Sequence, residues 1–212
     1  MIRTLPPATH ALIVAPHPDD EVIGCAAIID RLVRRGTRVS VVIVSDGAAS
    51  HPHSRAWPCQ RLVAERRRES RVALRRIGIA AGGIEFLNLP DGRVATSGCR
   101  AILARAIRRR RGIDLIVGPA AGDGHPDHRA VAAALAMPGR RIRRLHYQVW
   151  PPRAGGCGPV LTLPLPAAAK RSLVRVHATQ LGRIRDDPAG FAIAVHELDA
   201  FVRSPERHGL RA

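Results

Sequence analysis

Short runs of alanine, valine, leucine and isoleucine alternate with charged, helix-like segments over the first two-thirds of this 212-residue chain. The apolar runs predict strands at 12–15, 38–44, 84–87, 114–117 and 145–149. The segments between them predict helices at 21–35, 61–77, 98–111 and 127–136. Strands that alternate with helices at this spacing form parallel sheets, because a crossover helix brings the chain back in the same direction. The sequence therefore predicts an α/β fold with a Rossmann-like, mostly parallel sheet and helices on both faces.

The pattern changes after Trp150. A loop rich in proline and glycine precedes a strand-like run at 160–165 and a predicted helix at 166–181. The tail at 186–212 mixes proline, glycine and short apolar pieces and carries no motif that we can interpret, so its role stays open. The length suits one domain, and we expect residues 1–212 to form a single domain.

Two short clusters of histidine and carboxylate residues each follow an apolar run. The segment 17–21 (HPDDE) comes directly after the run 11–15, and the segment 125–128 (HPDH) comes shortly after 113–117. In open parallel sheets, ligands bind beyond the carboxyl ends of the strands. The two clusters are therefore expected to converge on one point.

The residue types in these clusters suit a hydrolytic zinc site. His17 and Asp20 stand three residues apart at a strand-to-helix junction, where the chain can turn both toward one ion, and His128 could supply a third ligand. Catalytic zinc usually takes three protein ligands and keeps a fourth position for water. The ion lowers the pKa of that water to about 7 and polarises a carbonyl oxygen. Asp19 would then lie beside the ion without binding it, which suits a general base.

Each cluster also has a simpler interpretation. Asp19, Asp20, Glu21 and Asp127 could be acidic residues that favour the first turn of a helix through its dipole, with the histidines as ordinary surface residues. That interpretation fits either cluster alone better than it fits two clusters that both follow a strand. We therefore favour the metal site, with Zn²⁺ as the expected ion and Fe²⁺ as an alternative that accepts the same ligands.

The chain is strongly basic, with a formal net charge of +17 and a single lysine, Lys170, among its basic residues. An arginine bias beside abundant alanine and glycine is what a GC-rich coding sequence produces without a functional cause. The functional alternative is attraction to nucleic acid, anionic lipid or a phosphorylated substrate. Aromatic residues make up only 3% of the chain and the arginines are scattered, which disfavours nucleic-acid binding as the main role. Attraction to anionic substrates or membrane surfaces is the better functional interpretation of this charge.

The cysteines and the apolar runs indicate the cellular location to be expected of the protein. Four cysteines lie far apart without a C-x-x-C pair, so neither a disulfide framework nor a zinc ribbon is expected. No apolar run approaches the length that spans a bilayer, and residues 1–10 lack the pattern of a signal peptide. We therefore expect a cytoplasmic protein, with its oligomeric state undetermined. The first strand is not followed by G-x-G-x-x-G, so the fold does not imply a dinucleotide.

The segments 15–21 (APHPDDE) and 124–128 (GHPDH) together resemble the LmbE/PIG-L family of zinc-dependent N-acetylglucosaminyl deacetylases. The resemblance covers about 10–181, the motif-bearing core of the expected domain. Shorter motifs of the family recur along the chain: Ser45-Asp46-Gly47, Arg66 with Glu69, Leu89-Pro90-Asp91-Gly92, and Lys170, Leu173, His177 and Gln180.

This resemblance implies the family's fold and a role for each matching residue. It implies His17, Asp20 and His128 as zinc ligands and Asp19 as the general base. It also implies that His125 faces the tetrahedral intermediate, as an electrostatic stabiliser or as a proton donor to the leaving amine.

Two further residues match positions that contact the sugar or its appended group in relatives. These are Arg66 and Asp91, for which the alternatives are an exposed helix residue and a turn-former before a glycine. Asp46 is expected to support the site, and His177 and Gln180 to pack the C-terminal helix against it without a catalytic role.

One position departs from the family pattern. Some relatives carry a tyrosine two residues before the HPDH motif, where its hydroxyl can polarise the amide oxygen. This chain has Asp123 there, and its single tyrosine, Tyr147, stands elsewhere. An ionised carboxylate cannot stabilise an oxyanion, so either the zinc and His125 supply that stabilisation or another group, which the sequence does not identify, replaces the tyrosine.

The expected function is hydrolysis of the acetamide group of a small N-acetylglucosamine-containing molecule or glycoconjugate by metal-activated water. The aglycone is open, and an amidase acting on another N-acyl group is a variant of the same chemistry. The alternative from another class is an arginine-rich protein that binds anions or nucleic acid and carries a non-catalytic metal site.

Overall fold

Seven strands form one sheet in the order β3-β2-β1-β4-β5-β7-β6 in the computed structural model, which describes residues 4–136, 142–152 and 160–210. The strands are β1 (His10–Ala15), β2 (Arg38–Ser45), β3 (Ile84–Leu89), β4 (Leu115–Pro119), β5 (Arg143–Tyr147), β6 (Val160–Leu163) and β7 (Glu206–Leu210). The first five pair in parallel, and β7 pairs antiparallel with both β5 and β6 at one edge. The prediction of a mostly parallel α/β sheet is confirmed.

Strand β1 is the centre of the sheet, and all six of its residues are buried. It pairs with β2 on one side and with β4 on the other, in the register Leu12 with Ser40 and Leu12 with Ile116. The strand order therefore reverses between β1 and β4. Such a reversal opens a crevice at the carboxyl ends of the two strands, where ligands bind in this type of fold. Each of the two histidine clusters follows one of these two strands.

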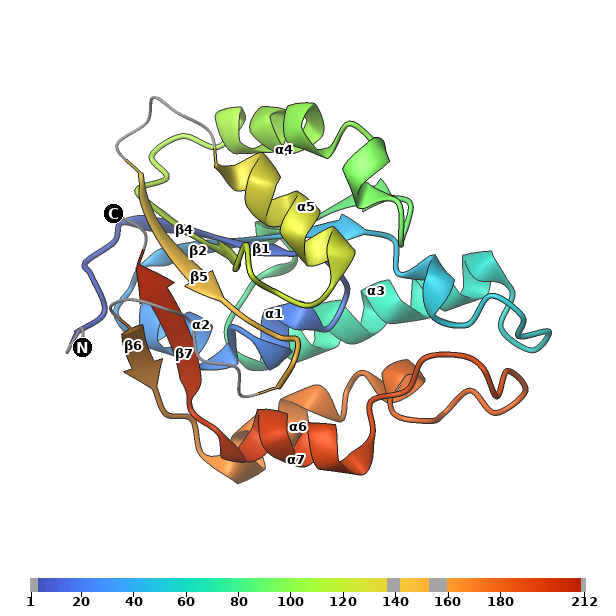
Figure 1. Ribbon diagram of the computed structural model, residues 1–212. Coiled ribbons are helices and arrows are strands. Elements are labelled where there is room, and N and C mark those ends of the chain that lie inside the picture. Colours follow the sequence, from blue (N-terminus) through green and yellow to red (C-terminus); the bar gives the residue numbers. More distant parts are fainter. Residues whose placement is uncertain (1–3, 137–141, 153–159, 211–212) are drawn as a thin grey trace.

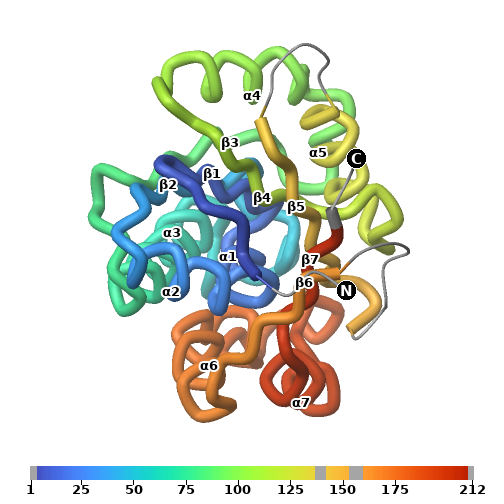
Figure 2. The backbone as a smooth tube through the Cα atoms, turned by 90° about the vertical axis from the view of Figure 1, so that its left-hand side faces the viewer, coloured from blue at the N-terminus to red at the C-terminus, as the bar shows by residue number. Residues whose placement is uncertain are grey.

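Helices cover both faces of the sheet, as predicted (Figure 1). Because successive side chains of a strand point to opposite faces, Ile13 belongs to one core and Leu12 to the other. The first core packs against α1 (Asp20–Ile23), α2 (Ala26–Arg34), α3 (Cys59–Arg76), α6 (Ala167–Val174) and α7 (Val195–Arg203). The second packs against α4 (Cys99–Arg108) and α5 (Pro126–Leu135). Figure 2 shows α4 and α5 on one side of the strands and α2, α3, α6 and α7 on the other.

Short 3-10 turns complete the element list at Ala48–Ser50, Ala81–Gly83, Val94–Thr96 and Ala178–Gln180. No helix within the described ranges combines the length and the apolar character needed to cross a bilayer.

The prediction of a single helix at 21–35 is wrong. The segment forms two helices, α1 and α2, with a break at Gly24 and Cys25. The ring of Tyr147 occupies the space beside Gly24, where an added Cβ would lie 2.3 Å from the ring. The Glu206 carboxylate accepts the backbone N–H groups of Ala27 (2.9 Å) and Ile28 (3.3 Å), at the start of α2. Side chains from distant parts of the chain therefore stabilise a break that the local periodicity does not show.

The C-terminal part also differs from expectation. The helix predicted at 166–181 ends at Val174, and a 3-10 turn follows it. The tail at 186–212, whose role the sequence left open, contributes α7 and β7 within its described part. Lys170 donates to Ile23 O (2.7 Å) and pairs with Glu206 in a buried contact. The tail is therefore bonded to the helices that follow β1.

Candidate active site

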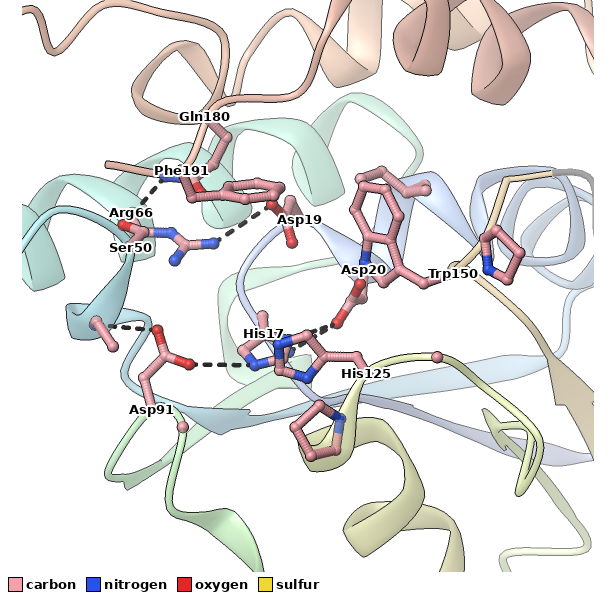
Figure 3. A pocket seen from close by; sticks show the side chains of 16 residues that line it. His17, Asp19, Asp20, Ser50, Arg66, Asp91, His125, Trp150, Gln180 and Phe191 are labelled. Atoms are coloured by element: carbon pink, nitrogen blue, oxygen red, sulfur yellow. Dashed lines mark hydrogen bonds and ion pairs between the residues drawn. The ribbon is translucent and has the colours of Figure 1, made fainter. Parts of the chain in front are cut away.

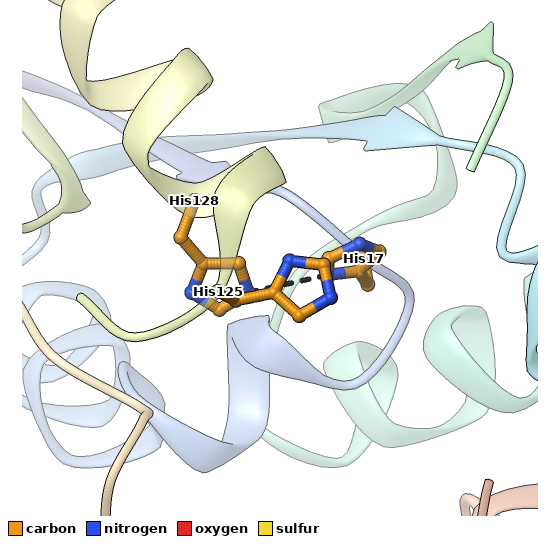
Figure 4. Close-up of side chains that lie close together, drawn as sticks. All are labelled: His17, His125 and His128. Atoms are coloured by element: carbon orange, nitrogen blue, oxygen red, sulfur yellow. Dashed lines mark hydrogen bonds between the residues drawn. The ribbon is translucent and has the colours of Figure 1, made fainter. Parts of the chain in front are cut away.

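The loops after β1 and β4 bring the two histidine clusters together. His17 stands in the loop between β1 and α1, and His128 lies in the first turn of α5. The two imidazoles meet, with His17 Nδ1 3.2 Å from His128 Nε2 (Figure 4). His125, the N-cap residue of α5, places its ring centroid 4.6 Å from that of His17 and 5.0 Å from that of His128.

Three atoms that could bind a metal ion form a nearly equilateral triangle. Asp20 Oδ2 lies 3.2 Å from His17 Nδ1 and 3.1 Å from His128 Nε2, and the two nitrogens are 3.2 Å apart. Ligands bound to a tetrahedral ion with bonds of 2.0–2.2 Å stand about 3.3–3.6 Å from one another. The triangle therefore needs to open by only a few tenths of an ångström to hold such an ion. One coordination position would remain for a further ligand.

Carboxylates stand behind both imidazoles of this triangle. His17 Nε2 lies 3.2 Å from Asp91 Oδ1 and 3.4 Å from Asp127 Oδ2, and His128 Nδ1 lies 3.2 Å from Asp123 Oδ2. A carboxylate in this position fixes the orientation of a ligand imidazole and raises its basicity. Burial opposes a charge on either ring, but the surrounding carboxylates outweigh it and raise the pKa of His17, and that of His128 to about 9. The pocket floor therefore favours a cationic occupant.

Asp123 takes a role that its sequence position did not indicate. Its carboxylate contacts His128 and also accepts the backbone N–H groups of His125 (2.9 Å), Val149 (2.8 Å) and Trp150 (3.1 Å). It thus joins the loop after β4, the loop after β5 and a histidine of the triangle. Tyr147 is buried, and its hydroxyl donates to Val14 O at 2.9 Å, outside the pocket.

Asp19 lies beside the triangle and is clamped by its neighbours. Its backbone has φ 142°, a conformation that residues other than glycine rarely adopt. The Asp19 N–H donates to Glu21 Oε2 (2.8 Å), and Arg66 Nη2 donates to Pro18 O (2.8 Å) and approaches Asp19 Oδ2 (3.3 Å). Burial raises the pKa of Asp19 to about 7, with Arg66 opposing the shift. A carboxylate with a pKa near neutrality is suited to accept a proton during a reaction.

Arg66 is buried, not exposed as the alternative interpretation of its helix position held. Besides Pro18 and Asp19, its guanidinium donates to Gly47 O at 2.9 Å. Gly47 has φ 72°, a backbone conformation that favours glycine. A Cβ at this position would also lie 2.5 Å from Arg66 Nη1, so a larger residue would clash with the guanidinium. Arg66 also lines the pocket, and its contact with a substrate stays a prediction.

Asp91 lies between His17 and the 3-10 turn at Ala48–Ser50. Its Oδ2 accepts the N–H of Ala49 (3.0 Å), while its own N–H donates to Asp46 Oδ1 (3.2 Å). Asp46 thus supports the site, as expected. Burial opposes ionisation of Asp91, but His17 outweighs it and lowers its pKa to about 2. The structure gives Asp91 a contact with His17 of the triangle, and its substrate contact stays a prediction.

His125 is half-buried at the edge of the pocket. Its Nδ1 accepts the N–H of Asp127 at 3.2 Å, which leaves the proton of the neutral ring on Nε2. Burial and the neighbouring His17 and His128 lower its pKa, so the neutral ring is favoured. A neutral imidazole with a proton on Nε2 can donate a hydrogen bond into the pocket.

The pocket around these residues has a volume of about 580 Å³ (Figure 3). Its floor contains His17, Asp20 and His125, and one wall contains Trp150 and Phe191. His177 and Gln180 lie against the site, as expected, but they lie at the 3-10 turn after α6 and not in a helix. His177 Nε2 is 3.6 Å from Glu21 Oε1, and Gln180 lines the pocket. Burial lowers the pKa of His177 to about 3, so its ring is neutral.

Comparison with known families agrees with this geometry. Residues 12–137 match the PIG-L family, described as GlcNAc-PI de-N-acetylase. The match covers more than half of the chain. The chain belongs to the PIG-L family.

A curated relative and a solved structure show how far the likeness extends. Over 142 residues the chain is 27% identical to 2'-N-acetylparomamine deacetylase of Streptomyces fradiae, covering 59% of this chain and 50% of the relative. The chain thus spans about half the length of that relative. An N,N'-diacetylchitobiose deacetylase from Pyrococcus horikoshii has a TM-score of 0.70 at 22% identity, over 96% of this chain and 84% of that one.

The same fold occurs in an enzyme of another class. A 4-carboxy-2-hydroxymuconate hydratase from Pseudomonas putida KT2440 has a TM-score of 0.66 at 17% identity, over 96% of this chain and 95% of that one. Both structural likenesses show the fold alone. Because one fold can host different reactions, the activity of this PIG-L family member has to be argued from its site.

The lining of the pocket contains residues that the sequence did not single out. Trp150 and Phe191 lie on loops whose composition carries no binding motif, and Phe191 belongs to the uninterpreted tail. Asp123 precedes the second cluster and Asp127 lies within it, and only their position near two histidines could have indicated that they support the imidazoles. The family motifs thus located the floor of the pocket and left its apolar wall undetected.

Proposed function

We propose that this PIG-L family member is a metal-dependent hydrolase that removes the acetyl group from an N-acetylated amino sugar. The observation that carries the proposal is the triangle of His17 Nδ1, Asp20 Oδ2 and His128 Nε2, with the Asp19 carboxylate beside it. Family membership supports the same chemistry, because the family is described as a de-N-acetylase.

In this proposal His17, Asp20 and His128 hold the ion. The mixed nitrogen and oxygen donors suit Zn²⁺, and Fe²⁺ accepts the same set. When bound, either ion would acidify a water molecule and polarise the amide carbonyl. Asp91, Asp123 and Asp127 orient the two imidazoles through their outer nitrogens.

Two residues of the chain act on the reacting groups in the proposed reaction. Asp19 accepts a proton from the attacking water and passes it to the leaving amine, and Arg66 with Glu21 holds its carboxylate and backbone in place. His125, whose neutral ring keeps its proton, donates a hydrogen bond from Nε2 to the developing oxyanion. His125 thus takes over the stabilisation that a tyrosine supplies in some relatives.

The sugar is proposed to lie on the Asp91 and Arg66 side of the pocket, with its acetamide over the triangle. A pocket of about 580 Å³ lies within the range of small-molecule sites and holds more than one hexosamine ring. We propose that the acyl group removed is acetyl. The pocket volume also permits a larger N-acyl group as a variant.

The distribution of acids disfavours an anion-binding role for the pocket. Six of the 17 aspartate and glutamate residues gather at this site in a chain of net charge +17. They are Asp19, Asp20, Glu21, Asp91, Asp123 and Asp127. A phosphate or nucleic-acid site would place basic donors there instead. Attraction to anionic surfaces is therefore assigned only to the arginines outside the pocket.

The proposal is tested by acetate release from a panel of N-acetylated glycosides, with the metal content of the same preparation measured. We expect activity that a chelator abolishes and Zn²⁺ or Fe²⁺ restores. Asp19→Asn should lower kcat by at least about 10²-fold while the metal content is kept, because it removes the base and leaves the triangle intact. Asp30→Asn, which alters a carboxylate on α2 paired with Arg34, is the matched control. Undiminished turnover in Asp19→Asn would remove Asp19 from the mechanism.

A further inference from the structure

An apolar ring stands exposed at the rim of the pocket. Phe191 retains 40% of its accessible surface, and in the described part of the chain only Val195 is a more exposed large apolar residue. The Phe191 ring meets Trp150 edge-on, with centroids 6.0 Å apart and planes at 89° (Figure 3). Together the two rings form one wall of the cavity that contains the metal-binding triangle.

The backbone around Phe191 is bonded on both sides of the ring. The Phe191 N–H donates to Ser50 O (2.7 Å), and the Ile193 N–H donates to Gln180 O (2.9 Å). Both acceptors belong to residues that line the pocket. The exposed ring is therefore held at a fixed place beside the site by hydrogen bonds to the pocket itself.

Trp150 is fixed from the opposite side. Its ring packs edge-on against Phe201 of α7, with centroids 5.4 Å apart. Its N–H donates to Asp123 Oδ2 (3.1 Å) and its carbonyl accepts the N–H of Gly124 (2.8 Å). Because Asp123 also contacts His128, the aromatic wall keeps a set distance from the metal-binding triangle.

The lining of the pocket contains polar and apolar residues. Asp91 lies beside His17, away from the two rings, while Ser50 lies next to Phe191 (Figure 3). The apolar residues of the lining are Ile23, Trp150, Pro151 and Phe191. A sugar that directs its acetamide to the floor and its hydroxyls toward Asp91 would present its aglycone to the aromatic rings. A second sugar would bring further hydroxyl groups to the Phe191 ring, which offers them no hydrogen-bond partner, and unpaired polar groups are costly to bury.

We infer that Trp150 and Phe191 bind an apolar aglycone, aryl or alkyl, of the N-acetylated amino sugar. Phe191, supplied by the C-terminal tail, is thus a specificity-determining residue. The inference rests on the proposed function for the reaction, and on the aromatic wall alone for the class of aglycone.

The test compares three probes on the metal-loaded protein: the methyl glycoside of N-acetylglucosamine, its phenyl glycoside, and the disaccharide of two N-acetylglucosamine units. Acetate release is measured for wild type, Phe191→Ala and Val195→Ala. Val195 is the matched control, because it is an exposed apolar residue of the same segment that does not line the pocket. We expect wild type to favour the phenyl over the methyl glycoside by about tenfold in kcat/KM. Phe191→Ala should bring this ratio close to one, and Val195→Ala should leave it unchanged.

Direct binding separates this inference from the proposed reaction. Calorimetric titration of the methyl and phenyl glycosides, with and without Phe191→Ala, reports the apolar wall without any turnover. Tighter binding of the phenyl glycoside that depends on Phe191, with no acetate released, would sustain the inference and refute the proposed function. Acetate release with a ratio that Phe191→Ala leaves unchanged, or that Val195→Ala lowers equally, would overturn the inference alone. A Phe191-dependent preference for the disaccharide would also overturn it, because the wall would then serve a second sugar.

Discussion

Asp19 holds a backbone conformation that its side chain disfavours. A φ of 142° in a residue with a Cβ costs about 1–3 kcal/mol, and such strain persists only where the surroundings impose it. Here Glu21 accepts the Asp19 N–H, and Arg66 binds both the preceding carbonyl and the Asp19 carboxylate. The conformation keeps the Asp19 carboxylate beside the triangle while the next residue, Asp20, contributes an oxygen atom to it.

Replacing Glu21 should therefore impair catalysis without emptying the metal site. Glu21→Ala removes the acceptor of the Asp19 N–H, and we expect kcat to fall by about 10²-fold, the cost of an ångström-scale misplacement of a reacting group. Glu21→Gln keeps an acceptor oxygen and should recover most of the activity. The measurements are kcat, KM and bound metal for both variants. Equal activity of Glu21→Ala and wild type would show that Arg66 alone holds Asp19.

The residues that we propose as metal ligands could be found from the sequence for a local reason. His17, Asp20 and His128 lie in short motifs directly after strands, and a parallel sheet sends the ends of its strands to one edge. Asp123 was visible only as a departure from the family, and its contact with His128 depends on the exact turn of the loop. No sequence pattern indicated that Phe191 lines the pocket, because its position depends on a contact with Ser50, which is distant in the sequence.

At the level of elements, the central strands were predictable and the C-terminal ones were not. Strand β1 is buried on both faces, and a strand in that environment has a continuous apolar run that can be recognised in the sequence. Strand β7 contains charged residues and glycine, and its place between β5 and β6 depends on partners distant in sequence. The break between α1 and α2 likewise depends on Tyr147 and Glu206, which no local pattern reveals.

The pair of Lys170 and Glu206 joins α6, β7 and the start of α2, and its loss should destabilise the fold. Removing one partner of a buried ion pair costs about 3–5 kcal/mol, because the other charge stays buried without compensation. We expect Glu206→Gln to lower the free energy of unfolding by about this amount at pH 7. Lys170→Met combined with Glu206→Gln should recover most of the loss, since no buried charge remains and the amide oxygen still accepts the Ala27 N–H.

The pH dependence of this effect has a defined sign. Burial opposes ionisation of Glu206, but Lys170 and His208 outweigh it and lower its pKa to about 2, below the ordinary value of 4.5. The contribution of the ionised carboxylate is therefore complete above about pH 4.5 and is lost as the pH falls toward 2. Urea unfolding of wild type and Glu206→Gln from pH 7 to pH 2.5 measures it. The difference between them should shrink at the acid end, and a constant difference would contradict the assignment.

For the whole molecule, the net charge and the charge of the pocket have opposite signs. The formal charge is +17, while carboxylates surround the two imidazoles of the triangle formed by His17, Asp20 and His128. The composition gives the net charge of the chain but not the charge of the pocket, because it contains no information on where the residues lie. An anionic substrate would be attracted by the molecule at a distance and opposed by its pocket at contact.

Ionic strength decides which of these effects dominates. The Debye length is about 30 Å at 0.01 M salt and about 10 Å at 0.1 M, so salt removes the long-range attraction and leaves the contacts inside the pocket. We expect kcat/KM for N-acetylglucosamine 6-phosphate, relative to that for N-acetylglucosamine, to fall as the salt rises from 0.01 M to 0.2 M. The neutral sugar serves as the internal control, because screening hardly affects its approach. Initial rates of acetate release for both sugars at each salt concentration give the ratio. A ratio that stays constant would mean that the arginines are too dispersed to steer substrates, and a rising ratio would mean that the net charge of the chain has no part in substrate capture.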